Sequence, residues 1–131
     1  MLIYIYEDGD HMIEILKALA DETRLRILAQ IFKGEMCVCE IEQSLALTQS
    51  NASRHLTILR KAGILEGYKN AQWVYYRVNE EFIKDNAYLY EYLKGKLNSI
   101  PCYDKDCENY NKCRQMNLCN CQNKLRGDIN E

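Results

Sequence analysis

Apolar residues recur at intervals of three and four near the start of the chain, which is the period of an amphipathic helix. They form two stripes: Met12, Ile15, Leu16 and Leu19, and then Leu25, Leu28, Ala29 and Phe32. We predict a helix from about residue 10 to residue 19 and a second helix that begins after Asp21, whose side chain can cap it. Lys33 and Gly34 suit the end of the second helix, as a cation near its negative pole and a glycine at the C′ position.

Residues 36–65 predict two further helices that are joined by a tight turn. The apolar stripe of the shorter helix is Val38, Ile41 and Leu45, and that of the longer helix is Ala52, Leu56 and Leu59. Thr48 stands at the N-cap of the longer helix, and Gly63 follows its end. A short helix, a turn and a longer helix with a polar and basic outer face are typical of a helix-turn-helix, whose second helix enters the major groove of DNA.

After the helix-turn-helix the apolar period falls to two, and aromatic and β-branched residues become frequent, which favours strands. We predict strands at 64–69 and 72–78, joined at Asn70 and Ala71, so that a hairpin, or wing, follows. A last helix is predicted over 80–97. Its apolar stripe is wider than a small monomer needs and predicts a dimer interface shared with the first helix. The predicted fold is mainly α with a small β-hairpin: a homodimeric winged helix-turn-helix.

The composition changes at Pro101, the only proline in the chain. We divide the chain there into a DNA-binding and dimerisation domain, residues 1–98, and a cysteine-rich tail, residues 99–131. Apolar residues other than cysteine are few and without period in the tail, so it buries too little to fold alone. It must be clamped by a metal ion, docked on the rest of the protein, or disordered.

The charge of the chain is unevenly distributed. The 131 residues carry a net charge of −2, which argues weakly against binding nucleic acid. Residues 43–79, however, hold five basic residues and one acid, so this segment has a charge of +4 and the remainder −6. A local basic patch of this kind binds phosphates in spite of an acidic total.

The outer face of the longer helix supplies the candidate contacts to operator DNA. They are Gln49, Ser50, Ser53, Arg54, Arg60 and Lys61. The four near the helix's N-terminal end are expected to reach base edges, and Arg60 and Lys61 to contact phosphates. His55 falls on the inner side beside Leu56, where we expect packing and a hydrogen bond rather than contact with DNA or a metal ion.

Seven cysteines would suggest disulfide bonds in a secreted protein, but the chain begins without the apolar core of a signal peptide. No apolar run approaches the roughly 20 residues that span a bilayer, so we expect a cytoplasmic protein without a membrane partner. In a reducing cytosol, clustered cysteines favour metal or redox chemistry over structural bridges. Two of them, Cys37 and Cys39, lie at the start of the third predicted helix, which supports the DNA-reading helix.

Three stretches, KALADETRLRIL (17–28), CVCEI (37–41) and LTQSNASRHLTILRKAGIL (47–65), together resemble the ArsR/SmtB family of winged-helix regulators. The resemblance covers about residues 12–97. It implies a homodimeric metalloregulatory repressor that leaves its operator when a toxic thiophilic ion binds. The Cys-Val-Cys motif resembles that family's site for As(III), Sb(III), Cd(II) or Pb(II). The family's other common site, for zinc on the last helix, is not expected, because residues 80–97 contain no histidine.

Two features depart from the family's pattern. Glu42 stands where some arsenic-sensing members carry another cysteine, and the wing lacks the usual glycine at its tip. On an ideal helix Cys37 and Cys39 would point about 100° to either side of Val38, so they converge only if the first turn unwinds. That distortion would carry ion binding to the helix that braces the DNA-reading helix.

The third ligand has to come from the tail. As(III) takes three soft thiolates, and every cysteine other than Cys37 and Cys39 lies beyond Pro101. We expect Cys102, the nearest in sequence, to complete the site, from the same subunit or from its partner. The remaining cysteines would be auxiliary ligands or a second site: Cys107, Cys113, Cys119 and Cys121.

Other functions remain open from the sequence. The same fold could sense Cd(II), Pb(II) or Zn(II), which prefer about four ligands, or could respond to thiol oxidation. A cysteine-rich metallochaperone is a weaker alternative, since it has no need of a capped helix-turn-helix. An enzyme is not expected, because the chain has no nucleotide-binding loop, no Cys-x-x-Cys before a helix and no histidine placed beside a thiol.

Overall fold

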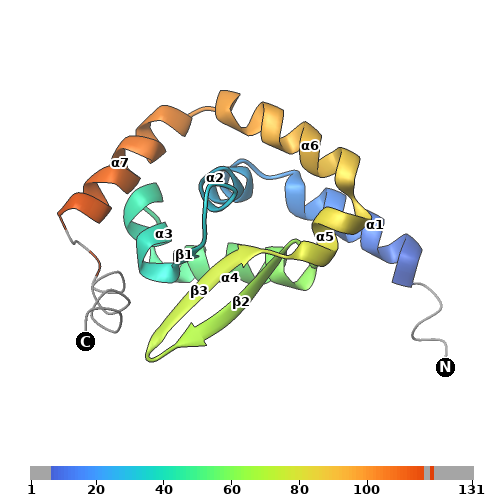
Figure 1. The fold of residues 1–131 in the computed structure, drawn as a ribbon, viewed down its shortest axis with the longest axis horizontal. Helices are drawn as coiled ribbons and strands as arrows, with labels where there is room; N and C mark the ends of the chain where they lie inside the picture. The colour runs from blue at the N-terminus through green and yellow to red at the C-terminus, as the bar shows by residue number, and fades with distance from the viewer. Residues whose placement is uncertain (1–6, 117–118, 120–131) are drawn as a thin grey trace.

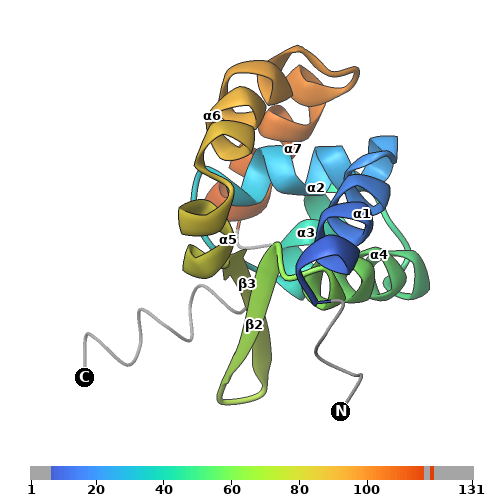
Figure 2. The same cartoon turned by 90° about the vertical axis from the view of Figure 1, so that its right-hand side faces the viewer.

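Helix α2 lies at the centre of the fold, with the other helices around it and the β-hairpin projecting to one side (Figure 1). The computed structural model describes residues 7–116 and residue 119. The elements in chain order are α1 (Glu7–Leu19), α2 (Glu22–Ile31), β1 (Met36–Cys37), α3 (Val38–Leu45), α4 (Gln49–Lys61), β2 (Leu65–Asn70), β3 (Trp73–Val78), α5 (Glu80–Asp85), α6 (Ala87–Lys96), the 3-10 turn η2 (Leu97–Ser99) and α7 (Tyr103–Gln115). Helices α6 and α7 lie on the side opposite the hairpin in both views (Figures 1 and 2). None of the helices described is long and apolar enough to cross a bilayer.

Two predicted helix starts are confirmed by their N-caps. The Asp21 carboxylate accepts a hydrogen bond from the Arg24 backbone N–H at 3.0 Å, and the Thr48 hydroxyl accepts one from the Asn51 N–H at 3.1 Å. Each bond satisfies one of the donors that a helix leaves unpaired at its N-terminus. Gly63 follows the end of α4 with a φ of 81°, which glycine adopts without the steric penalty of a Cβ.

The C′ glycine predicted at the end of α2 is wrong, because Phe32 is the C-cap and Gly34 lies one residue beyond C′. Among the described residues, Gly63 is the one glycine with a positive φ. Helix α2 ends instead in a tighter turn, in which the Gly34 N–H donates to the Ile31 carbonyl at 3.0 Å. The left-handed position of the helix-turn-helix falls between its two helices, where Ala46 has a φ of 55°.

The strands form an antiparallel sheet in the order β1-β3-β2. Asn70 pairs with Trp73, so the hairpin turn lies one position later than predicted and begins at Ala71, whose φ is 59°. A positive φ at this position is typical of tight hairpins. Strand β1 was not predicted, because two residues are too few to show alternation. Its pairing of Cys37 with Tyr75 attaches the start of α3 to the wing.

The single helix predicted over residues 80–97 is wrong, because the structure divides it into α5 and α6 at Asn86. Asn86 leaves the helical conformation, with φ −133° and ψ 49°. Its side-chain Nδ2 donates to the Phe82 carbonyl at 3.3 Å. Local hydrogen bonds of this kind compete with the regular helix, and the break turns α6 across α2.

The tail forms a helix, α7, that docks on α2 and α3, which is one of the three outcomes predicted for it. Asp106 is 1% exposed and accepts two hydrogen bonds of 2.9 Å from the Arg26 guanidinium. The same guanidinium donates to the Leu45 carbonyl at 3.0 Å, and Asn109 Nδ2 donates to the Ser44 carbonyl at 3.1 Å. Polar contacts to α2 and to the end of α3 therefore hold a helix whose sequence offers little apolar surface.

Replacing Asp106 with Asn should lower the free energy of unfolding by about 3–5 kcal/mol, because the Arg26 charge would remain at a buried contact without its partner. Urea denaturation followed by circular dichroism measures this change. Glu108→Gln is the matched control, since Glu108 lies on the exposed face of the same helix, 4.0 Å from Lys105. Exposed pairs of this kind contribute under about 1 kcal/mol. Equal losses in the two variants would contradict the docking role of Asp106.

Candidate metal centre and nucleic-acid interface

Three cysteine sulfurs lie close together. They belong to Cys37 in β1, to Cys39 in α3 and to Cys119, which follows α7 in the sequence. Cys37 Sγ lies 2.8 Å from Cys39 Sγ and 3.5 Å from Cys119 Sγ. Cys39 and Cys119 are joined by a disulfide in the structure. Among the described residues, these three form the group whose ligand atoms, all within 4.8 Å of one another, could hold a single ion.

Cys37 and Cys39 converge because Cys37 lies outside the helix. Its backbone is extended, with φ −83° and ψ 162°, and α3 begins at Val38. The divergence expected from an ideal helix therefore does not arise, and the first turn of α3 need not unwind. The third sulfur belongs to Cys119, which lies 80 residues after Cys39 in the sequence. Helix α7 brings Cys119 to the cluster.

The buried carboxylate of Glu40 joins the two halves of this cluster. Its side chain is 0% exposed, and Oε1 accepts a hydrogen bond from the Cys37 N–H at 3.1 Å, as the third helical residue does in a capping box. Oε2 lies 2.7 Å from Nε of Arg114, near the end of α7, in an ion pair. One carboxylate thus positions Cys37 and the end of the helix that leads to Cys119.

The structure does not bring Cys102, the expected third ligand, to this cluster. Cys102 is exposed at the start of α7, and the far end of that helix is the end that reaches the thiols. Cys107 instead contacts Lys33, which follows the end of α2. Cys121 lies outside the described residues. Within one chain, the length of α7 separates Cys102, at the N-terminus of that helix, from Cys37.

The donor set of the cluster suits a soft ion. Thiolates bind soft ions at about 2.3 Å, and the three sulfurs lie within 4.8 Å of one another. Cys113 is buried in contact with the same cluster. Burial, and to a smaller extent the charge of Glu40, raises the pKa of the Cys113 thiol. The cluster therefore places three sulfurs together, beside the Cys113 thiol, whose raised pKa favours its neutral form.

A cavity of about 450 Å³ opens beside the thiols, between α3, the start of α4 and β3. Cys37 and Cys39 line one part of it, Gln49 and Ser53 another, and Trp73 closes it from the wing. The cavity gives a small ion access to the sulfurs. It also places the thiols and two of the predicted DNA contacts around one space.

The six predicted DNA contacts on α4 are all exposed. Helix α4 and the hairpin lie on the same side of the protein, away from α6 and α7 (Figures 1 and 2). In the wing, Arg77 pairs with Glu66 at 2.8 Å, and its guanidinium lies 4.9 Å from the centre of the Tyr68 ring. The basic surface is therefore concentrated on α4, with little from the wing.

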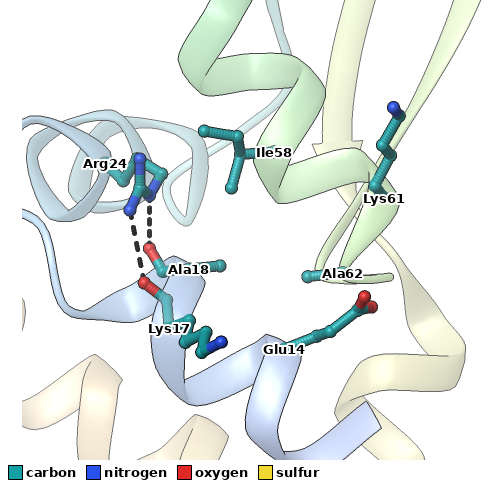
Figure 3. A pocket seen from close by; sticks show the side chains of 7 residues that line it. All are labelled: Glu14, Lys17, Ala18, Arg24, Ile58, Lys61 and Ala62. Carbon is teal, nitrogen blue, oxygen red and sulfur yellow. Dashed lines mark hydrogen bonds between the residues drawn. The ribbon is translucent and has the colours of Figure 1, made fainter. Parts of the chain in front are cut away.

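His55 packs inside with a hydrogen bond, as predicted. It is 5% exposed, and its Nδ1 accepts from Arg24 Nη1 at 3.1 Å. Burial lowers the pKa of His55, although the charge of Asp21 acts the other way, so the neutral imidazole is favoured. Arg24 also donates to the carbonyls of Lys17 and Ala18 beside a cavity of about 270 Å³ (Figure 3). These bonds fix α4 against α1 and α2.

Known proteins share the helix-turn-helix region. The sequence profile of the arsR family of bacterial regulatory proteins matches residues 21–66, from the N-cap of α2 into β2. ArsR2 of Pseudomonas putida, an arsenic resistance transcriptional regulator, is 46% identical over 85 residues, which are 64% of this chain and 71% of the relative. The chain belongs to the arsR family. ArsR1 of the same organism is 50% identical over 80 residues, 56% of this chain, and the match spans 62% of that protein's length.

Solved structures of similar fold extend the comparison. The homodimeric winged helix-turn-helix domain of Mb0332 from Mycobacterium bovis matches this arsR-family chain with a TM-score of 0.60 at 26% identity, over 72% of this chain and 89% of that one. HlyU from Vibrio cholerae matches with a TM-score of 0.57 at 34% identity, over 68% and 97%. The predicted winged helix-turn-helix is confirmed.

The sequence named Cys119 only as an auxiliary or second-site ligand, and the roles of Glu40 and Asp106 were missed. One signal could have placed α7. Tyr103, Asp106, Tyr110 and Cys113 recur at spacings of three, four and three, and this stripe faces the protein. An acid and two tyrosines occupy positions where aliphatic residues are expected. A search for periodic aliphatic residues therefore does not detect this helix.

Proposed function

We propose that this chain is a metal(loid)-responsive transcriptional repressor of the cytoplasm, which binds a palindromic operator as a homodimer. Reduced Cys37, Cys39 and Cys119 take As(III) or Sb(III) as three thiolates, and the protein then leaves the DNA. The observation that carries this proposal is the convergence of three sulfurs from distant parts of the chain against the helix that supports α4. The names of the two Pseudomonas relatives, both arsenic resistance regulators, support the choice of ion.

The position of Cys37 suggests how the thiols act on DNA binding. Cys37 belongs to β1, which pairs with β3 of the wing, and it caps α3, which packs on α4. A movement of its sulfur toward Cys119 therefore acts on both DNA-facing elements. To work as a switch, this coupling has to change operator affinity by about 1–3 kcal/mol or more.

Thiol oxidation is the second candidate input, and the Cys39–Cys119 disulfide favours it. A four-sulfur metal site is a third candidate, because Cys113 lies beside the cluster and a fourth sulfur suits Cd(II), Pb(II) or Zn(II). Release by arsenite under full reduction distinguishes ion sensing from oxidation. Dependence of the response to Cd(II), but not to arsenite, on Cys113 distinguishes a four-sulfur site from a three-sulfur site.

Arg54→Ala should weaken operator binding by about 1–3 kcal/mol if the exposed Arg54 side chain reads a base. Titration of operator DNA over a series of salt concentrations measures this loss. Lys105→Ala is the control, because Lys105 is a similarly exposed cation on α7, away from the DNA-facing side. Operator affinity unchanged in Arg54→Ala would overturn the placement of α4 in the major groove.

Cys119→Ser should leave operator binding near normal but require a much higher arsenite concentration for release, because a hydroxyl is a poor substitute for a soft thiolate. Release is followed by fluorescence anisotropy of labelled operator in excess reductant. Cys102→Ser, which changes an exposed cysteine on the same tail, should respond like the unaltered protein. A full arsenite response in Cys119→Ser would exclude the three-sulfur site while leaving the DNA-binding function intact.

The dimer interface is proposed on α1 and α6, which leave large apolar side chains exposed. Met12, Ile13 and Leu16 are 49–60% exposed on α1, and Tyr88 and Tyr92 are 93% and 61% exposed on α6. Large apolar side chains exposed along helices are typical of an interface rather than of a monomer.

Leu16→Glu should convert the dimer into a monomer, because it places a charge at the centre of this apolar surface, and operator affinity should fall with it. Sedimentation velocity measures the assembly state. Met116→Glu is the control, since Met116 is 64% exposed but lies at the end of α7. A Leu16→Glu variant that still sediments as a dimer would place the interface elsewhere.

A further inference from the structure

Cys107 lies on the face of α7 that meets α2, in contact with three hydrogen-bond donors. Lys33 Nζ lies 3.0 Å from its Sγ, and Gln30 Nε2 lies 3.6 Å away. The Tyr103 hydroxyl donates to the same sulfur. None of these contacts involves the Cys37–Cys39–Cys119 cluster, so the function of that cluster does not account for them.

The charge around this sulfur favours the thiolate. Lys33 is held in place by two rings, with its Nζ 5.4 Å from the centre of Tyr103 and 5.9 Å from that of Tyr110. The nearest buried acid, Asp106, is turned toward Arg26 instead. Burial acts to raise the pKa of Cys107, but the donors, led by Lys33, outweigh it and lower the pKa.

The sulfur is accessible to small reagents, and an unpaired acceptor lies on the residue beside it. Cys107 is partly exposed, and its partner Lys33 is exposed. Gln30 is 3% exposed, and its Oε1 has no hydrogen-bond partner among the described residues although its Nε2 faces the sulfur. Leaving a buried acceptor unpaired is costly, so a hydroxyl donor attached to this sulfur would be stabilised here.

We propose that Cys107 is a site of oxidation by hydroperoxides, separate from the three-thiol cluster. The thiolate attacks one peroxide oxygen, the O–O bond breaks, and the leaving oxygen takes a proton from the Lys33 ammonium or from solvent. The sulfur is oxidised to a sulfenic acid and hydrogen peroxide is reduced to water. The new S–OH group donates to Gln30 Oε1, which fills the vacant acceptor. This reaction needs neither operator DNA nor a bound ion, so it goes beyond the proposed repressor function.

The test uses the full-length reduced protein at pH 7, treated with hydrogen peroxide in the presence of dimedone, with each cysteine quantified by peptide mass spectrometry. Cys107 should be labelled at least about tenfold faster than Cys102, since an ordinary thiol is only a few per cent ionised at this pH. Cys102 is the internal control because it is the more exposed of the two. Equal labelling, or faster labelling of Cys102, overturns the proposal.

Two Lys33 variants test the cause of the reactivity. Lys33→Gln should slow the labelling of Cys107 several-fold and leave Cys102 unchanged, because it removes the cation beside the sulfur. Lys33→Arg, which keeps the charge, should retain most of the rate. Lys33 is exposed, so both variants are expected to fold. A Lys33→Gln rate equal to that of the unaltered protein overturns the proposal.

Discussion

Two buried carboxylates hold α7 on a protein to which it offers little apolar surface. Asp106 extends from α7 to Arg26 on α2, and Glu40 extends from α3 to Arg114 on α7. A buried ion pair adds little stability compared with a well-packed apolar contact, but removing one partner is strongly destabilising. The position of α7 therefore depends on both pairs being complete. Since α7 leads to Cys119, the geometry of the three-sulfur cluster depends on these pairs as well.

The docking of α7 lowers the entropic cost of bringing Cys119 to the metal site. Cys39 and Cys119 are 80 residues apart, and closing a free loop of such length lowers the chain entropy, although only slowly with further length. In this fold the contacts of α7 with α2 and α3 have already ordered most of that loop. An ion that binds the three sulfurs therefore needs to order little additional chain, and preorganisation of this kind strengthens binding. A disordered cysteine-rich tail would lack this advantage.

Local signals in the sequence predicted the helix-turn-helix and the wing but not the long-range contacts of the fold. The caps at Asp21 and Thr48 and the spacing of the helix-turn-helix were predictable because each depends on neighbours within one or two turns. The Cys-Val-Cys pair identified two members of the cluster for the same reason. The break at Asn86 and the two-residue β1 depend on competition between local structures of similar free energy, which the sequence pattern does not rank. Cys119 could not be chosen over Cys102, because the choice depends on ion pairs between residues up to 80 positions apart.

Cys37 has two structural roles, because it belongs to a strand and also caps a helix. As part of β1 it is paired with Tyr75 of the wing, and as the N-cap of α3 it supports the helix that braces α4. A ligand shifts a conformational equilibrium only through a difference in affinity between the two states. Under the proposed function, the sulfur arrangement that holds an ion must therefore differ from the arrangement that suits DNA. The cavity of about 450 Å³ that Cys39 and Gln49 help to line provides space for such a difference. A small displacement of Cys37 toward Cys119 would then alter both DNA-facing elements at once, without any change in the core around α2.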